Sequence, residues 1–338
     1  MSESCTGNAS FGGTSVKLPR RTFLHLAAGA AALPVLPRAA SALDYPMRPV
    51  RMVVGFAPGT GPDIIVRLLA QQLSARLGQQ VVIDNRPGAG TNIATEVVVH
   101  ASPDGYTLLV ITGVNTVNAT LYHNLNFDFI HEIAPVAGLA SGQFVMVVTP
   151  SFPAKSVPEF IAYAKANPGK INMASVGVGA AGHVFGELFK MMAGVDLLHV
   201  PYRGNFYPDL LSGQMQVAFA NVASSIEFIR AGKLRALAVT TAERSDLLPD
   251  LPTINEFVPD YEASGWYGIG APWHTHDDIV RKLNTEINAV LADPTFRAKL
   301  AEFGNSPLVM TPSQLEKFMA DDIDKWAKVI KFANIKPE

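Results

Sequence analysis

Two glycine-rich turns carry the residues best suited to chemistry. One runs from Phe56 to Asp63 and the other from Val176 to His183, and each lies between an apolar β-rich run and residues with helical apolar spacing. Glycine lets the backbone approach a ligand closely, and a helix start offers unpaired N–H groups with a partial positive charge. The two turns therefore predict capture of an anion by backbone groups, without Lys or Arg.

The second turn also fits a dinucleotide-binding pattern. Residues 177–182 read G-x-G-x-x-G after a strand-like run and before a helix. A dinucleotide site also calls for an acidic residue at the end of the next strand, which here ends Val200-Pro201-Tyr202-Arg203. The missing acid disfavours a cytoplasmic dinucleotide oxidoreductase, a reading that would also require residues 1–42 to be retained.

Catalytic and metal-binding patterns are weak. His183 and Glu187 are spaced i, i+4, as metal ligands can be, but no third ligand is evident in the sequence. No hydrolase, metalloprotease or P-loop motif occurs. We therefore expect no catalytic residues, no metal and no cofactor, and the alternative function is an exported enzyme acting on a carboxylic acid.

The turns are set in alternating elements. Residues 50–112 predict strand, helix, strand, helix and strand, which is typical of a doubly wound α/β sheet. The alternation restarts at Phe144, with predicted helices over 157–166 and 181–193. After Ile269 the chain is mostly helical, over 277–291, 295–303 and 312–333.

A helical tail must pack on an existing sheet, which predicts a return to the first domain. We expect domain 1 to comprise 43–143 and 265–338, and domain 2 to comprise 144–264. The chain would cross near Ser141-Gly142 and Ala263-Ser264-Gly265. Two domains joined by two crossings enclose a cleft that can hinge shut on a ligand.

The N-terminus predicts export. Arg20-Arg21, the apolar run 23–36 and Ala40-Ser41-Ala42 form the three parts of a signal peptide cleaved near Ala42. The arginine pair fits twin-arginine export, and an ordinary secretory route stays open. Cleavage removes Cys5, the sole cysteine, and leaves an acidic chain unsuited to nucleic acid. We expect a monomer without stable membrane insertion.

The chain resembles a known family, the Bug-type periplasmic receptors of the tripartite tricarboxylate transporter system. The matching stretches, which follow one another over nearly the whole mature chain, are 45–51, 56–67, 82–90, 102–109, 177–188, 200–204 and 265–268.

This resemblance implies a two-domain, type II periplasmic-binding α/β fold. It would contain two mixed, mostly parallel sheets with helices on both faces, and two hinge crossings. It also implies a small carboxylate ligand in the cleft and, as partners, the membrane components of a tripartite tricarboxylate transporter, or else a sensing role. The ligand could be a dicarboxylate, an amino acid or an aromatic acid.

The family's binding positions map onto both turns and the strands beside them. The first loop would supply Phe56, Pro58, Gly59, Thr60 and Asp63, and the second Gly177, Val178, Gly179, Ala180 and His183. The cleft would also be lined by Thr112, Asn115, Ala223 and Ser224, with Tyr202 and Trp266 as walls.

The chain departs from the family pattern at two places. The first loop reads Gly59-Thr60-Gly61, where the family more often has two adjacent glycines. The link after Gly204 is short and aromatic, which suggests that Phe206 or Tyr207 narrows the distal end of the pocket or stacks on the ligand there.

Overall fold

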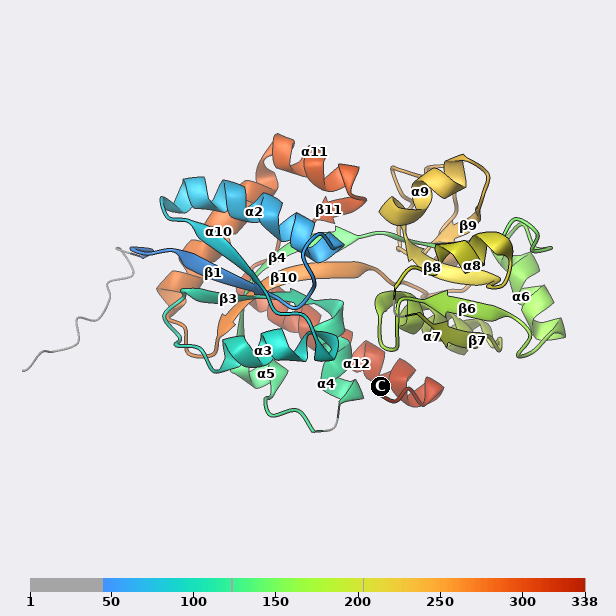
Figure 1. The fold of residues 1–338 in the computed structure, drawn as a ribbon, viewed down its shortest axis with the longest axis horizontal. Helices are drawn as coiled ribbons and strands as arrows, with labels where there is room; N and C mark the ends of the chain where they lie inside the picture. Colours follow the sequence, from blue (N-terminus) through green and yellow to red (C-terminus); the bar gives the residue numbers. More distant parts are fainter. Residues whose placement is uncertain (1–44, 123, 203, 338) are drawn as a thin grey trace, which may run out of the picture. The chain divides into compact units, whose positions relative to one another are not determined.

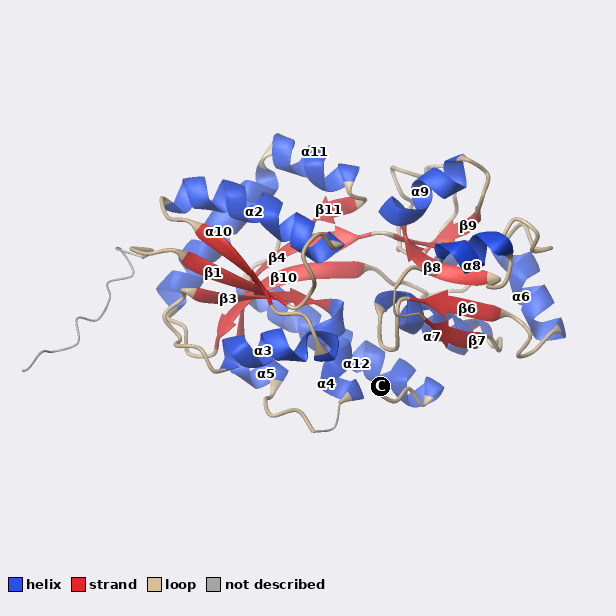
Figure 2. Ribbon diagram, in the orientation of Figure 1, coloured by secondary structure: helices blue, strands red, loops and turns tan. Residues whose placement is uncertain are grey.

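The computed structural model describes residues 45–122, 124–202 and 204–337, which fall in one compact unit. Two β-sheets form its framework, and helices pack against them (Figures 1 and 2). The predicted export signal, 1–42, lies outside the described residues. No helix in the described part of the chain is both long and apolar enough to cross a membrane.

The first sheet has six strands and draws on distant parts of the sequence. In sheet order they are β11 (Asn305–Pro307), β4 (Ile133–Gly142), β10 (Gly265–Pro272), β3 (Thr107–Thr112), β1 (Val50–Val54) and β2 (Val81–Asn85). Figure 1 shows β10, coloured orange, next to the N-terminal strands. The late strands β10 and β11 thus complete a sheet begun by the first residues of the fold.

Helices from both halves of the sequence accompany this sheet. They are α2 (Gly61–Leu77), α3 (Asn92–Val99), α4 (Gly113–Leu121), α5 (Phe129–Glu132), α10 (Asp277–Ala292), α11 (Pro294–Glu302) and α12 (Pro312–Ala333), with a 3₁₀ turn, η2 (Ala89–Thr91), before α3. One core joins strands β1, β3, β4 and β10 to α2, α10 and α11. Another packs α3, α5 and α12 with Trp266 of β10.

The second sheet has five strands. Their order is β7 (Leu198–Pro201), β6 (Asn172–Ser175), β8 (Val217–Asn221), β5 (Phe144–Val148) and β9 (Arg235–Val239). Its helices are α6 (Val157–Ala166), α7 (Ala181–Ala193), α8 (Tyr207–Ser212) and α9 (Val222–Arg230), with a 3₁₀ turn, η3 (Ile254–Glu256). We call the six-stranded sheet with its helices the first lobe, and the five-stranded sheet with its helices the second lobe.

The sheets are mixed, as expected, and most strands of each sheet run in the same direction. Parallel pairing is limited to β1 with β2 and β3, and β6 with β7 and β8. β10 and β11 pair antiparallel with their neighbours in the first sheet, and β5 does so in the second. The chain enters the second sheet on β5 and returns on β10, so these crossing strands run against the βαβ units.

Candidate functional site

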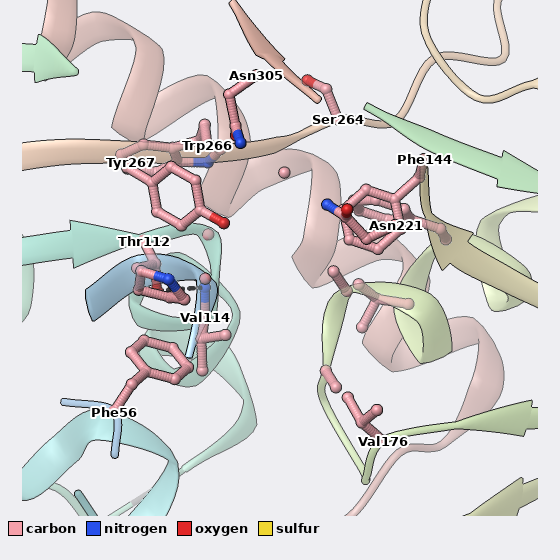
Figure 3. A pocket seen from close by; sticks show the side chains of 18 of the residues that line it. Phe56, Thr112, Val114, Phe144, Val176, Asn221, Ser264, Trp266, Tyr267 and Asn305 are labelled. Carbon is pink, nitrogen blue, oxygen red and sulfur yellow. Dashed lines mark hydrogen bonds between the residues drawn. The ribbon is translucent and has the colours of Figure 1, made fainter. Parts of the chain in front are cut away.

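A cavity of about 430 Å³ is lined by residues of both lobes. Its size is that of a small-molecule pocket. Figure 3 shows Phe56, Thr112 and Tyr267 of the first lobe on one side and Phe144, Val176 and Asn221 of the second on the other. The starts of α2, α4, α7 and α9 all contribute to the wall.

These four helix starts differ in their capping. The hydroxyl of Thr112 accepts from the N–H of Val114 at the start of α4, and Asn221 Oδ1 accepts from the N–H of Ala223 at the start of α9. Among the described residues, no side chain caps the first turn of α2 or of α7. Because first-turn N–H groups lack partners within the helix, α2 and α7 can receive an anion.

The loop before α2 is held by a charged network. Gly59 has φ of 81°, and its N–H donates to Asp63 Oδ2 over 2.8 Å. Arg67 Nε donates to the same oxygen over 2.9 Å, and Asn85 Nδ2 donates to Asp63 Oδ1 over 2.8 Å. Asn85 Nδ2 also reaches the Phe56 carbonyl at 3.0 Å. The carboxylate of Asp63 therefore fixes the loop from behind.

Opposing effects set the pKa of Asp63. Burial by itself would raise the pKa, but hydrogen bonds from Arg67, Gly59 and Asn85, together with the positive charge of Arg67, lower it to about 2. Asp63 is thus an ionised structural acceptor at neutral pH.

The loop before α7 is held by neutral groups instead. Gly179 has φ of 75°, and its N–H donates to His183 Nδ1 over 3.1 Å. The His183 ring stacks on His199, with centroids 3.5 Å apart, and His199 Nε2 lies 2.7 Å from the Ser175 hydroxyl. Ser175 in turn donates to the Gly177 carbonyl over 2.9 Å. An imidazole that accepts at Nδ1 and is stacked on another ring is best kept neutral.

The pKa values of both histidines agree with this arrangement. Burial first, and then the neighbouring His199 and Lys190, lower the pKa of His183 to about 3. Burial and Lys190 lower that of His199 to about 4. Both rings are therefore uncharged at neutral pH.

Glu187, which lies four residues after His183, pairs with Lys190 rather than with the histidine. Lys190 Nζ donates to Glu187 Oε1 over 3.0 Å, whereas His183 Nε2 is 3.8 Å from that oxygen. The described residues contain no group of three potential metal ligands.

The third glycine of the G-x-G-x-x-G pattern has a packing role. A Cβ at Gly182 would lie 2.5 Å from the carbonyl oxygen of Phe219 on β8, so α7 rests directly on that strand. One turn later, a Cβ at Gly186 would lie 2.1 Å from Met173 Sδ. Close helix–strand packing accounts for this glycine without a bound dinucleotide.

Seven of the sixteen predicted binding residues line the cavity, namely Phe56, Thr112, Gly179, Ala180, Ala223, Ser224 and Trp266. The other nine do not, namely Pro58, Gly59, Thr60, Asp63, Asn115, Gly177, Val178, His183 and Tyr202. Several of the nine hold the loops in place: Asn115 Oδ1, for example, accepts from the N–H of Thr112 over 2.9 Å.

The aromatic link after Gly204 also lies outside the wall. Phe206 is buried in the core of the second lobe, stacked on Tyr207, and neither ring lines the cavity. Tyr207 contacts a residue that does line the cavity, because its hydroxyl is 2.8 Å from that of Ser224.

Residues that the sequence analysis did not place in the cleft complete the wall. Phe144, Phe185, Tyr267 and Trp326 all line the cavity, and Trp326 comes from α12 near the C-terminus. Tyr267 had a sequence signal, because it lies within the 265–268 stretch next to the expected Trp266. Phe185 and Trp326 had none, because they read as core residues of amphipathic helices.

Asp322 holds two tryptophans of the wall. Trp266 Nε1 donates to its Oδ2 over 3.0 Å, and Trp326 Nε1 donates to its Oδ1 over 2.8 Å. Thr116 of α4 donates to Oδ2 over 2.6 Å. One carboxylate thus joins three elements behind the cavity.

Comparison with known proteins places this geometry in a family. The family described as "Tripartite tricarboxylate transporter family receptor" matches residues 65–335. Protein BugT of Bordetella pertussis is 35% identical over 296 residues, which cover 86% of this chain and 91% of BugT.

Two solved structures share the fold and more than a quarter of the sequence. Rpa4515 of R. palustris, solved with adipate, has a TM-score of 0.78 at 37% identity and covers 87% of this chain and 100% of its own. MatC of Rhodopseudomonas palustris, with bound malate, has a TM-score of 0.73 at 30% identity and covers 85% and 100%. With a family match over most of its length, the chain belongs to the Bug-type receptors of the tripartite tricarboxylate transporter family.

Proposed function

We propose that this chain is an extracytoplasmic solute receptor that captures a small carboxylate in the cavity between its lobes. The N–H groups at the starts of α2 and α7 would hold the carboxylate. The observation that carries this proposal is that both starts lack a side-chain cap and face one cavity whose described lining residues include no charged side chain. Relatives solved with adipate and malate support a carboxylate ligand.

The remaining assignments extend this proposal, with support from family membership and from the pattern of residues 20–42. The protein would act in the periplasm after cleavage near Ala42 and deliver its ligand to the membrane components of a tripartite tricarboxylate transporter, or act as a sensor. The domain boundaries at 143/144 and 264/265 belong to this proposal, as does hinge closure on the ligand.

Removing the backbone N–H of Ala181, one of the proposed donors to the carboxylate, tests the proposal. Ala181 is the first residue of α7, and Ala180 before it is extended, with ψ of 156°, so proline fits there and removes only the N–H. We expect Ala181→Pro to weaken carboxylate binding about tenfold, because a hydrogen bond to a charged group is worth about 1.5–3 kcal/mol. Isothermal titration calorimetry against a panel of carboxylates measures the change.

Ala181→Val is the matched control, because it adds similar bulk and keeps the N–H. If the valine variant loses as much affinity as the proline variant, steric fit rather than the N–H holds the acid. Chromatography of the released ligand separates a receptor from an enzyme: a receptor returns the acid unchanged. If no carboxylate binds the native protein, the proposed function is wrong.

A further inference from the structure

The cavity wall is aromatic on every side. Phe56, Trp266 and Tyr267 come from the first sheet and its loops, Phe144 and Phe185 from the second lobe, and Trp326 from α12. Among the described residues that line the cavity, none is Asp, Glu, Lys, Arg or His. The body of the ligand therefore meets mostly carbon.

The rings are arranged as an ordered array. Phe144 meets Phe185 edge to face, with centroids 4.9 Å apart at 73°, and Phe185 stacks on Trp326 at 5.4 Å and 22°. Edge-to-face and offset-stacked pairs are the arrangements that aromatic rings prefer. A planar ring in the cavity could extend this array.

The tryptophans offer ring surface rather than donors. Both indole N–H groups donate to Asp322, so neither is free for a polar ligand. The N–H of Val114 in α4 and that of Ala223 in α9 also have partners, Thr112 and Asn221. These four N–H groups are therefore not available to a second carboxylate.

The polar side chains that line the cavity are all neutral, namely Thr112, Asn221, Ser224, Ser264, Tyr267 and Asn305. In Figure 3, the hydroxyl of Tyr267 and the amide nitrogen of Asn221 point into it from opposite sides. No described residue hydrogen-bonds to the Tyr267 hydroxyl, and burial raises its pKa to about 12, so it is a neutral donor. Neutral groups such as these can orient a carboxylate, but they do not neutralise the charge of a second one.

We propose that the ligand is a monocarboxylate whose carbon body is an aromatic ring. This inference rests on the proposed function, because the carboxylate would bind at the starts of α2 and α7. The ring would lie among Phe56, Phe144, Phe185 and Trp326. A second carboxylate, as in adipate or malate, would lose its hydration without meeting a cation.

Calorimetry with four probes tests the ligand class. Benzoate and 2-naphthoate supply a ring with one carboxylate, cyclohexanecarboxylate supplies the same charge without aromaticity, and adipate supplies two carboxylates. We expect the better aromatic acid to bind at least tenfold more tightly than adipate, and more tightly than cyclohexanecarboxylate. If adipate binds most tightly, the aromatic inference is wrong and the carboxylate receptor stands. If none binds, and the wider carboxylate panel fails too, the proposed function is wrong as well.

Phe144→Leu tests the ring contact. Phe144 is only partly buried, so a folded variant is expected, and thermal unfolding verifies it. We expect a fivefold or greater loss for the aromatic acid and a smaller loss for cyclohexanecarboxylate. Equal losses for both acids would contradict an aromatic contact. The control is Phe332→Leu on α12, which is 55% exposed and outside the cavity, and should change neither affinity.

Discussion

The loops before α2 and α7 share one geometry but are built from different chemistry. In each, a glycine with positive φ donates its N–H to a side chain four residues later: Gly59 to Asp63, and Gly179 to His183. In the first lobe that acceptor is a carboxylate held by Arg67 and Asn85, and in the second it is a neutral imidazole stacked on His199.

The difference shows that the same need, an acceptor that holds the loop in front of a helix, can be met by a charged or by a neutral side chain. Each acceptor lies at the third position of its helix and bonds the loop behind the helix start, so neither caps the first turn. The N-cap side chains of α2 and α7 make no hydrogen bond to the first turn either. Because one acceptor is charged and the other is neutral, the stability of the two loops should respond differently to mutation and to pH.

The largest difference is expected from removing the charged acceptor. Asp63→Ala leaves three donors without their buried partner and should lower the free energy of unfolding by about 3 kcal/mol. Urea denaturation measures this. The control is Asp84→Ala, which breaks more exposed pairs with Arg51 and Arg86 and should cost about 1 kcal/mol or less. Equal losses would show that Asp63 has no special role in the first loop.

Acid should affect the second loop before the first. Because the folded pKa values of His183 and His199 lie below the ordinary value of 6.5, the unfolded chain binds more protons, and stability falls as the pH drops from about 6.5 toward 4. The slope is about 1.4 kcal/mol per pH unit for each histidine. Asp63, with its lowered pKa, adds stability that is lost only between about pH 4 and 2.

The raised pKa of Glu187 acts in the opposite direction, because burial makes the folded state take up its proton first. Urea titrations at pH 7 and pH 5 therefore compare the native chain with His199→Gln, in which Glu187 is unchanged. We expect the variant to show a shallower loss on acidification. An unchanged slope would mean that His199 is not kept neutral by the fold.

The two glycines should differ in their tolerance of alanine. A Cβ at Gly59 meets nothing within 4 Å, so Gly59→Ala should cost only about 1 kcal/mol for its left-handed backbone. A Cβ at Gly179 lies 3.0 Å from Leu121 Cδ2, so Gly179→Ala should cost about 2 kcal/mol. Adding Leu121→Ala should reduce the extra cost in a double-mutant cycle, and strict additivity would exclude this contact as its cause.

The smallest effect is expected from supplying the missing cap. Ala180→Ser places a hydroxyl at the N-cap of α7 and should stabilise the fold by about 1 kcal/mol while weakening carboxylate binding, because both compete for the same N–H groups. Thermal unfolding and calorimetry measure the two effects. Ala180→Val, which offers no acceptor, should not raise stability, and a serine variant with unchanged affinity would argue against anion capture at α7.

Local sequence patterns predicted most elements, since hydrophobic periodicity and turn residues act over short distances. Helices α6, α7 and α12 were expected with the bounds they have. Strand β4 and helix α4 were not expected, because Ile133–Gly142 is rich in small residues and four of the nine residues of Gly113–Leu121 are Asn or Thr, which are weak helix formers.

The sequence by itself determined the family, the positions of the two glycine-rich turns and the absence of a dinucleotide acid, because each depends on residues that are neighbours in the chain. The tertiary structure decided which side chains line the cavity. Asp63 and His183 occupy positions that predict ligand contact, yet their hydrogen-bond partners turn them into supports for the loops. Trp326 joins Trp266 through Asp322 only after the chain has folded back on itself, because residues distant in sequence meet through packing that no local pattern records.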